Sequence, residues 1–226
     1  MLLDIANLSS QVTLPSGDIL TTVDNVSLTL TRGKSYSIVG KSGSGKTSLI
    51  SIIGMLNARF TGSYLYKDTD VTTLSDRERA KLRAERIGFV FQNYSLIKHL
   101  SVWENVALPL KYANKHISKK KLREAAYTVL SEVGLSDKTK AMPTHLSGGE
   151  QQRVAIARAL VANPEFIICD EPTGALDTAT GEAVMALLHN LVHEHQATML
   201  LVTHDKDIAG LCDENFVMDR GSLAHA

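Results

Sequence analysis

The sequence predicts an α/β protein with a mostly parallel sheet, an N-terminal antiparallel β region and an inserted helical region. Three observations predict this fold class. A glycine-rich loop at 40–47 lies between a β-prone run and an apolar run of helix length; strand-like and helical runs alternate after residue 164; and apolar residues recur with a helical period between 93 and 163. Alternating strands and helices favour a parallel sheet with helices on both faces.

The first forty residues indicate strands. Apolar and polar residues alternate over 26–30, and Gly33 follows in a turn-like run before the β-prone residues 35–39. This pattern predicts a hairpin that joins 26–30 to 35–39. A further run, Tyr64–Tyr66, predicts an edge strand.

Helical and strand signals follow in turn. Ser75 with Glu78 three residues later predicts a capping box at the start of a helix over 75–86. In the helical region an apolar face is formed by Leu122, Ala126, Val129 and Val133. The neighbouring lysines 119–121 are interpreted as a solvated helix start rather than a binding patch. Strands are predicted at 87–91, 166–169, 198–202 and 215–218, and a helix at 181–195.

The composition limits the function classes. The chain has 226 residues, with 24 lysines and arginines balanced by 24 aspartates and glutamates, so no overall field attracts it to nucleic acid. The apolar runs are of strand length, which predicts a protein that is soluble by itself. The two cysteines, Cys169 and Cys212, lie in apolar surroundings and are expected to be core thiols in a reducing cytoplasm.

The loop Gly40-Lys41-Ser42-Gly43-Ser44-Gly45-Lys46-Thr47 fits the phosphate-binding pattern G-x-x-x-x-G-K-[ST]. Its glycines let backbone N–H groups approach phosphate oxygens, and the following helix directs its positive end at the same anion. Lys46 is then placed to reach the β- and γ-phosphates, and the Thr47 hydroxyl to bind Mg²⁺.

Two further motifs carry chemistry. Asp170 and Glu171 end an apolar strand, at the edge where ligands bind in open α/β sheets. Asp170 is placed to orient the Mg²⁺ shell and Glu171 to polarise a water. Ser147, Gly148 and Gly149 open a helix and offer N–H donors to a second anion, although Ser-Gly-Gly alone could be a simple N-cap.

Taken together, these motifs resemble those of a known protein family. With Leu146-Ser147-Gly148-Gly149-Glu150 as the signature motif, the chain resembles the ATP-hydrolysing subunit of an ABC transporter over nearly its whole length. The other motifs match in order: the Walker A loop at 40–47, the Q-loop Gln92, Walker B at 166–170, the catalytic Glu171, the D-loop Ala175-Leu176-Asp177 and the switch His204.

The resemblance implies a single domain over 1–226. It consists of a β and RecA-like P-loop NTPase core at 1–92 and 164–226 and a helical subdomain at 93–163. ATP and Mg²⁺ are the implied cofactors, with Mg²⁺ near Thr47, Gln92 and, through water, Asp170. Residues implied to bind ATP are Gly40, Lys41, Ser42, Gly43, Ser44, Gly45, Lys46, Thr47 and Ser48.

The resemblance also implies a homodimer with two ATP molecules. Each ATP is held by the Walker A loop of one chain and closed over by Ser147, Gly148, Gly149 and Glu150 of the other. Glu171 is implied to position the water and His204 to contact the γ-phosphate. Gln92 is implied to sense Mg²⁺ and Lys46 to act in catalysis.

The implied membrane partner is a separate permease that docks near Gln92 to Trp103, which places the chain at the cytoplasmic face of the membrane with no nucleic-acid partner. Tyr94, Leu96, Ile97 and Trp103 are candidates for this interface, and Trp103 is equally a candidate for the core. The residues 170–177 and 203–205 look most like the branch of macrolide exporters, lipoprotein-releasing ATPases, antimicrobial-peptide pumps and haem-efflux pumps.

One position departs from the family pattern. The family usually places an aromatic residue before Walker A to stack on adenine, and the nearest match here is Val12. We therefore predict weak adenine stacking and better competition by GTP than in stacked relatives.

Other functions remain alternatives. An ABC protein of DNA repair would carry a long coiled-coil insertion, one of translation would carry tandem copies, and a P-loop kinase would lack both the signature motif and Glu171. An ABC ATPase whose membrane partner regulates cell-wall enzymes fits the same motifs as an exporter.

Overall fold

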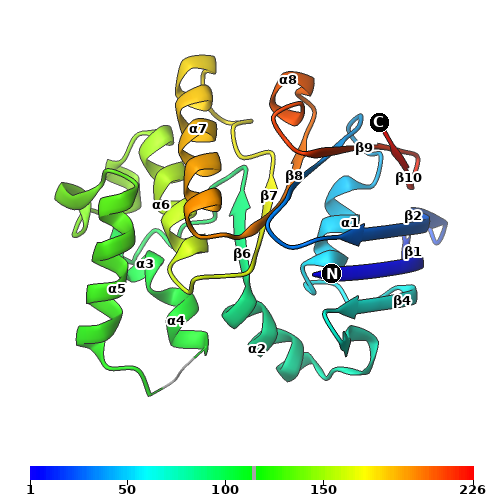
Figure 1. The fold of residues 1–226 in the computed structure, drawn as a ribbon, viewed down its shortest axis with the longest axis horizontal. Coiled ribbons are helices and arrows are strands. Elements are labelled where there is room, and N and C mark those ends of the chain that lie inside the picture. The colour runs from blue at the N-terminus through cyan, green and yellow to red at the C-terminus, as the bar shows by residue number, and fades with distance from the viewer. Residues whose placement is uncertain (114–115) are drawn as a thin grey trace. The chain divides into compact units, whose positions relative to one another are not determined.

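The computed structural model describes residues 1–113 and 116–226, which form two compact units (Figure 1). The first unit contains residues 1–80 and 198–226, and the second contains residues 81–197. The predicted limits of the helical region, 93 and 163, both lie within the second unit.

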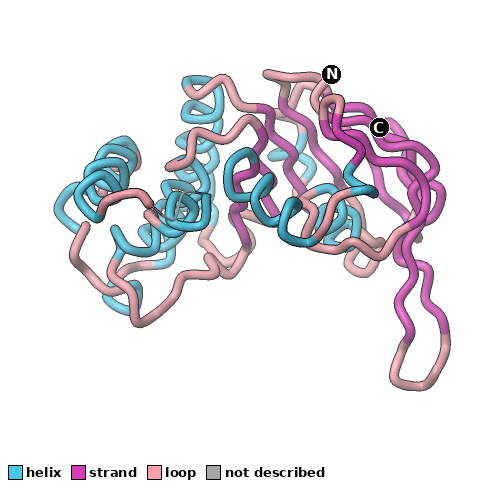
Figure 2. Tube along the Cα trace, turned by 90° about the horizontal axis from the view of Figure 1, so that it is seen from below, coloured by secondary structure: helices cyan, strands magenta, loops and turns pink. Residues whose placement is uncertain are grey.

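The first unit begins with an antiparallel sheet in the strand order β2-β1-β4-β5. Its strands are β1 (Leu3–Thr13), β2 (Ile19–Leu30), β4 (Thr61–Tyr66) and β5 (Thr69–Asp70). Leu3, Ile5 and Leu8 of β1 are buried, whereas the end of the β1–β2 hairpin is exposed and extends away from the other strands (Figure 2). The strand predicted at 64–66 exists, but the short β5 lies outside it and is the edge.

The same unit contains a mostly parallel set of strands in the order β10-β9-β3-β8. They are β3 (Ser35–Val39), β8 (Thr198–Thr203), β9 (Glu214–Asp219) and β10 (Ser222–His225), with the short helix α8 (Lys206–Ala209) between β8 and β9. β3 is parallel to both β8 and β9, and β10 is antiparallel to β9.

The predicted hairpin between 26–30 and 35–39 is therefore wrong. β2 pairs with β1, while β3 pairs with β8 and β9. The burial patterns give the reason: alternate residues of β2 are exposed, as in a sheet with one wet face, but the central residues of β3 are buried on both faces. A strand buried on both faces belongs in a parallel sheet.

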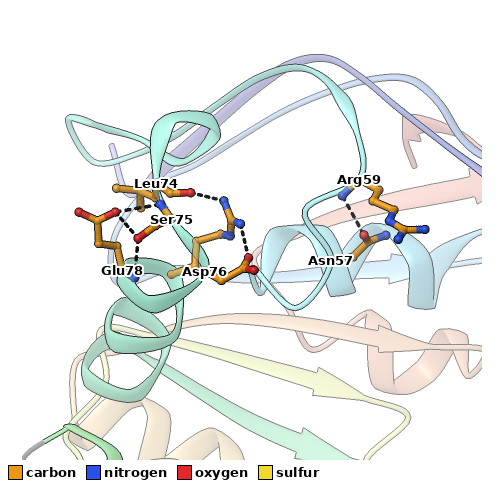
Figure 3. A network of polar contacts seen from close by, with 7 residues as sticks. Asn57, Arg59, Leu74, Ser75, Asp76 and Glu78 are labelled. Atoms are coloured by element: carbon orange, nitrogen blue, oxygen red, sulfur yellow. Dashed lines mark hydrogen bonds and ion pairs between the residues drawn. The ribbon is translucent and has the colours of Figure 1, made fainter.

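Two helices and a 3-10 turn complete this part of the chain. They are α1 (Lys46–Ile53), η1 (Val71–Thr73) and α2 (Asp76–Arg86), which runs from the first unit into the second. The predicted capping box is confirmed: the Ser75 N–H donates to Glu78 Oε2 at 2.8 Å, and the Glu78 N–H donates to Ser75 Oγ at 3.4 Å (Figure 3). Arg79 adds an ion pair to Asp76 in the same turn.

The second unit pairs β6 (Ile87–Phe91) with β7 (Phe166–Asp170) in parallel, from Ile87 beside Phe166 to Phe91 beside Asp170. Between these strands, the described residues form helices without any strand, as predicted for 93–163. They are α3 (Val102–Val106), α4 (Leu108–Ala113), α5 (Lys119–Glu132), η2 (Ser136–Lys138), η3 (Pro143–His145) and α6 (Gly148–Leu160); α7 (Thr178–Glu194) follows β7.

Helix α5 confirms the predicted amphipathic pattern. Leu122, Ala126 and Val129 are buried, and lysines 119–121 form its exposed first turn, where the Ser118 side chain accepts from the Lys121 N–H. Across residues 1–113 and 116–226, no helix has the length and apolar character needed to cross a membrane.

Candidate nucleotide-binding site

The glycine loop of the first unit connects β3 to α1 and lies in close contact with β9 and β2. A β-carbon on Gly40 would lie 2.3 Å from Met218 O of β9. Gly45, with φ +106°, has Thr22 O of β2 at 2.1 Å from the corresponding position. No residue with a side chain fits either place without moving backbone, so the glycines set the path of the loop.

The polar groups of this loop fit a phosphate. Lys46 is only 8% exposed, and its ammonium donates to Gly40 O at 2.6 Å and Lys41 O at 3.0 Å. The buried Ser44 hydroxyl has no hydrogen-bond partner among the described residues. Gly45 gives α1 no side-chain cap, so its first N–H groups also lack that partner. A buried cation, a buried hydroxyl and a helix N-terminus suit an anion with several oxygens.

His204 leaves its strand at the same edge as this loop. β3 and β8 are parallel, with Val39 beside Thr203, so Gly40 and His204 follow neighbouring strand ends. The His204 side chain is exposed, and the residue before it, Thr203, accepts from the Asp205 N–H at 3.1 Å. The first unit thus brings together the loop 40–47, Ser48 and His204.

In the second unit, Gln92 and Glu171 follow neighbouring strand ends in the same way, because Phe91 lies beside Asp170. The Gln92 amide packs against the turn after β7: a β-carbon on Gly174 would lie 2.6 Å from Gln92 Nε2. Glu171 has φ +47°, an uncommon backbone for a residue with a side chain, and its carbonyl accepts from the Gly174 N–H at 3.0 Å. Such backbone is concentrated at functional sites.

The segment 146–150 opens α6 with a capping box. Ser147 Oγ accepts from the Glu150 N–H at 3.3 Å, and the Ser147 N–H donates to Glu150 Oε2 at 2.8 Å. This bond from the Ser147 backbone holds the pKa of Glu150 below its ordinary value. Ser147 therefore does serve as an N-cap, and the anion role of this segment stays a prediction.

Gly148 is closely covered by two side chains of the same unit. A β-carbon there would lie 2.9 Å from Tyr94 Oη and 3.2 Å from Leu176 Cδ2. Leu176 belongs to the predicted D-loop, where Asp177 caps α7 by accepting from the Thr180 N–H at 3.0 Å, which lowers the pKa of Asp177. The second unit thus brings Gln92, Ser147–Glu150, Asp170, Glu171 and Ala175–Asp177 into one body.

Sequence reasoning missed two residues that hold the loop after Gln92. The buried Asn105 accepts from the Ile97 N–H at 2.7 Å, and its amide donates to the carbonyls of Ile97, Leu100 and Ser101. Arg158 of α6 donates to the carbonyls of Tyr94 and Ser95. For Asn105, the sequence offered one signal, which is an asparagine between the apolar Val102 and Val106. For Arg158, nothing in the sequence indicated its role.

The strand, the glycine loop with its buried lysine and the helix that follows define the first unit as that of a phosphate-binding P-loop protein. The segment 146–150, which opens α6, points to one family within this class of protein, and comparison with known proteins identifies that family.

The family model described as "ABC transporter" matches residues 23–174. The chain belongs to this family of ATP-hydrolysing proteins, which bind ATP and use Mg²⁺ in catalysis. A solved dimeric bacterial ABC transporter cassette is 37% identical, with a TM-score of 0.90, and the match covers 99% of this chain and 97% of that one. A cassette dimer bound to ADP and phosphate after hydrolysis is 36% identical, with a TM-score of 0.89 over 99% of this chain and 98% of that one.

Curated relatives differ in what they transport. A macrolide export ATP-binding/permease protein of Campylobacter jejuni is 47% identical over 82% of this chain. A methionine import ATP-binding protein of Haemophilus influenzae is 42% identical over 90% of this chain. This chain spans 28% of the exporter's length and 59% of the importer's. A third relative, an ABC transporter ATP-binding protein of Bacillus subtilis, is 44% identical over 89% of this chain, and that match covers 90% of the relative.

Proposed function

We propose that this chain is the ATP-hydrolysing subunit of a bacterial ABC transporter, a homodimer that drives a separate membrane permease. The observation that carries the proposal is the loop 40–47. It combines a buried lysine, a buried Ser44 hydroxyl that has no hydrogen-bond partner in the described part of the chain, and the N-terminus of α1. The dimeric cassettes that resemble this chain support the homodimer.

In this proposal the loop binds the ATP phosphates. Lys46, which donates to Gly40 O and Lys41 O in this structure, turns to the β- and γ-phosphates, while Ser44 and the first N–H groups of α1 hold their oxygens. Thr47, Gln92 and, through water, Asp170 would hold Mg²⁺, which would supply neutralisation of phosphate charge. Lys41, Ser42, Gly43, Gly45 and Ser48 complete the phosphate cradle.

Hydrolysis transfers the γ-phosphoryl group to water. Glu171 accepts a hydrogen bond from that water, which attacks phosphorus as the bond to the β-phosphate oxygen breaks; the products are ADP and phosphate, and the water's proton is released. His204 donates to a γ-phosphate oxygen. Ser147, Gly148 and Gly149 of the second chain, with Glu150 capping their helix and Ala175–Asp177 beside them, close the site.

The permease is proposed to dock on the segment from Gln92 to Trp103. The side chains of Tyr94, Leu96, Ile97 and Trp103 are each half-buried, so the segment offers apolar surface while staying anchored. Asn105 fixes its second half through the Ile97, Leu100 and Ser101 backbone. An anchored segment can pass a displacement to the rest of its unit. A chain docked on its permease in this way lies at the cytoplasmic face of the membrane.

For the cargo we propose efflux or extraction of a hydrophobic or amphipathic compound, such as a drug, peptide, haem or lipoprotein. The motifs at 170–177 and 203–205 and the 47% identity to the macrolide exporter support this branch. Import is the competing direction, and the methionine importer at 42% identity favours it. A membrane partner that regulates cell-wall enzymes is the third possibility.

The test is to identify the membrane protein that co-purifies with the tagged chain from detergent-solubilised membranes of its native host. A permease with an export or extraction function supports the proposal. An import permease with a binding protein, or a partner bound to cell-wall hydrolases, would overturn the direction or the transport role. A variant with Leu96 and Ile97 changed to serine serves as the docking control and is expected to lose the partner while retaining ATP binding.

A further inference from the structure

The segment after Gln92 is fixed to helix α6 by one side chain. Arg158 Nη1 donates to Ser95 O at 2.6 Å, and Nη2 donates to Tyr94 O at 2.8 Å. A guanidinium is planar and holds its donors in a fixed fork, so two bonds to consecutive carbonyls fix both the position and the orientation of those peptides. Burial lowers the pKa of Arg158, but an arginine stays charged in proteins, and both bonds are charge-assisted.

The backbone that Arg158 holds is unfavourable by itself. Tyr94 has φ +60° and Ser95 has φ +48°, so two successive residues with side chains lie in the left-handed region. Such conformations persist when the surroundings determine them. The turn has two backbone bonds of its own, from the Tyr94 N–H to Phe91 O at 3.1 Å and from the Ser95 N–H to Asn93 O at 2.6 Å. Arg158 adds the bonds to both carbonyls, and its removal is expected to loosen the turn.

The other end of Tyr94 reaches the start of α6. Its hydroxyl oxygen lies 2.9 Å from the place of a β-carbon on Gly148, the first residue of the helix. Arg158 comes ten residues later, about 15 Å along the axis. Because helical side chains tilt toward the N-terminus, Arg158 extends back toward Gly148. Tyr94 therefore lies along α6, held at its carbonyl by Arg158 and next to Gly148 at its hydroxyl.

We propose that Tyr94 and Arg158 form a strut that couples the segment after Gln92 to the opening of α6. Both are positioning residues: Arg158 fixes the position of Tyr94, and Tyr94 fixes how closely other groups can approach the backbone of Gly148. A displacement of the segment by a docked permease is passed through the strut to Ser147–Gly149. This inference rests on the proposed function, in which those residues close over the ATP of the second chain.

The first experiment is hydrogen exchange of the backbone amides at 147–150 in the monomer, without nucleotide. Arg158→Met and Tyr94→Ala are expected to speed exchange there at least about tenfold relative to amides 154–157 of the same helix. Tyr94→Phe is the matched control: it loses the hydroxyl but keeps the ring, whose Cζ lies 3.9 Å from the same position, and should stay within about threefold of wild type. Arg158→Lys, which has charge without the fork, should give an intermediate rate.

The second experiment measures ATP-dependent dimerisation by sedimentation in a Glu171→Gln background. Arg158→Met and Tyr94→Ala are expected to weaken the dimer at least about tenfold, with nucleotide affinity of the monomer unchanged within about twofold. A loss of structure would lower both values together. If Arg158→Met does not fold, the Tyr94→Ala and Tyr94→Phe pair decides.

The outcomes separate the two proposals. Unchanged exchange at 147–150 in Arg158→Met and Tyr94→Ala overturns the strut, as does an unchanged dimer. Absence of any ATP-dependent dimer in Glu171→Gln alone counts against the proposed function, and the exchange experiment then still decides whether the strut exists.

Discussion

Lys46→Ala is the substitution that most directly probes the loop 40–47. In this structure its ammonium is buried and bonded to Gly40 O and Lys41 O. With nucleotide bound, an ammonium about 4 Å from a phosphate charge contributes about 4 kcal/mol at an effective dielectric constant of 20. Part of this is recovered by Mg²⁺ and water, so we expect Lys46→Ala to bind ATP at least about a hundredfold more weakly.

The same substitution also affects folding. It leaves two carbonyls without their charged donor, each such bond being worth about 1.5–3 kcal/mol, but it also removes a buried charge. We expect a net loss of about 1–3 kcal/mol in the free energy of unfolding and a melting temperature lower by several degrees. A hundredfold loss of affinity is about 2.7 kcal/mol, so the two losses are of similar size and ATP affinity has to be measured at a temperature where the variant is folded.

Isothermal titration with ATP and Mg²⁺, together with a thermal melt, measures both quantities. Lys34→Ala is the control: it removes the same charge from the other end of β3, roughly 17 Å away, where Lys34 pairs with Glu214 at 2.7 Å on the surface. It should leave ATP affinity within about twofold. If Lys46→Ala binds ATP within about fivefold of wild type, the loop is not the phosphate site.

Three other predictions concern separate parts of the chain. Val12 is 42% exposed on the β1–β2 hairpin, so Val12→Tyr should add a ring for adenine and raise the preference for ATP over GTP in a competition assay; an unchanged ratio would show that position 12 does not face the base. Burial raises the pKa of Cys212 to about 12, so its thiol should resist alkylation at pH 8 until the protein unfolds, and rapid labelling of folded protein would contradict this. The bond from the Ser147 N–H lowers the pKa of Glu150 in the folded protein. The resulting stabilisation is present at pH values above the pKa of Glu150 in the unfolded chain, and it is lost as the pH falls through the pKa in the folded protein. Glu150→Gln should therefore flatten the loss of stability below about pH 4.5 in acid denaturation, and an unchanged acid slope would contradict the contribution of this pair.

Much of this architecture could be predicted from the sequence because it depends on local patterns. The loop 40–47 contains its own glycines and lysine, the capping box at Ser75 depends on residues three apart, and the α5 face repeats with the helical period. The family match and the solved cassettes confirm the fold class. The roles of the individual site residues stay predictions.

The hairpin prediction that failed and the site residues that were missed both depend on contacts between residues that are distant in sequence. The turn at Gly33 could equally close a hairpin or pass between sheets, and only the burial of β3 on both faces distinguishes these. Arg158 contacts Tyr94 and Ser95 across more than sixty residues, so no local pattern reveals it. Likewise, no local pattern predicts the left-handed backbone of Tyr94, whose carbonyl Arg158 binds.

The proposal that the loop 40–47 is half of an ATP site completed by a second chain is tested most directly with Glu171→Gln. The variant should bind ATP through the intact loop but fail to activate the water, so that the dimer accumulates. Sedimentation with ATP and Mg²⁺, beside a phosphate-release assay, should show a stable dimer and no turnover, whereas Lys46→Ala should give neither dimer nor turnover. A Glu171→Gln protein that hydrolyses ATP at the wild-type rate, or that binds ATP and stays a monomer, would contradict this account.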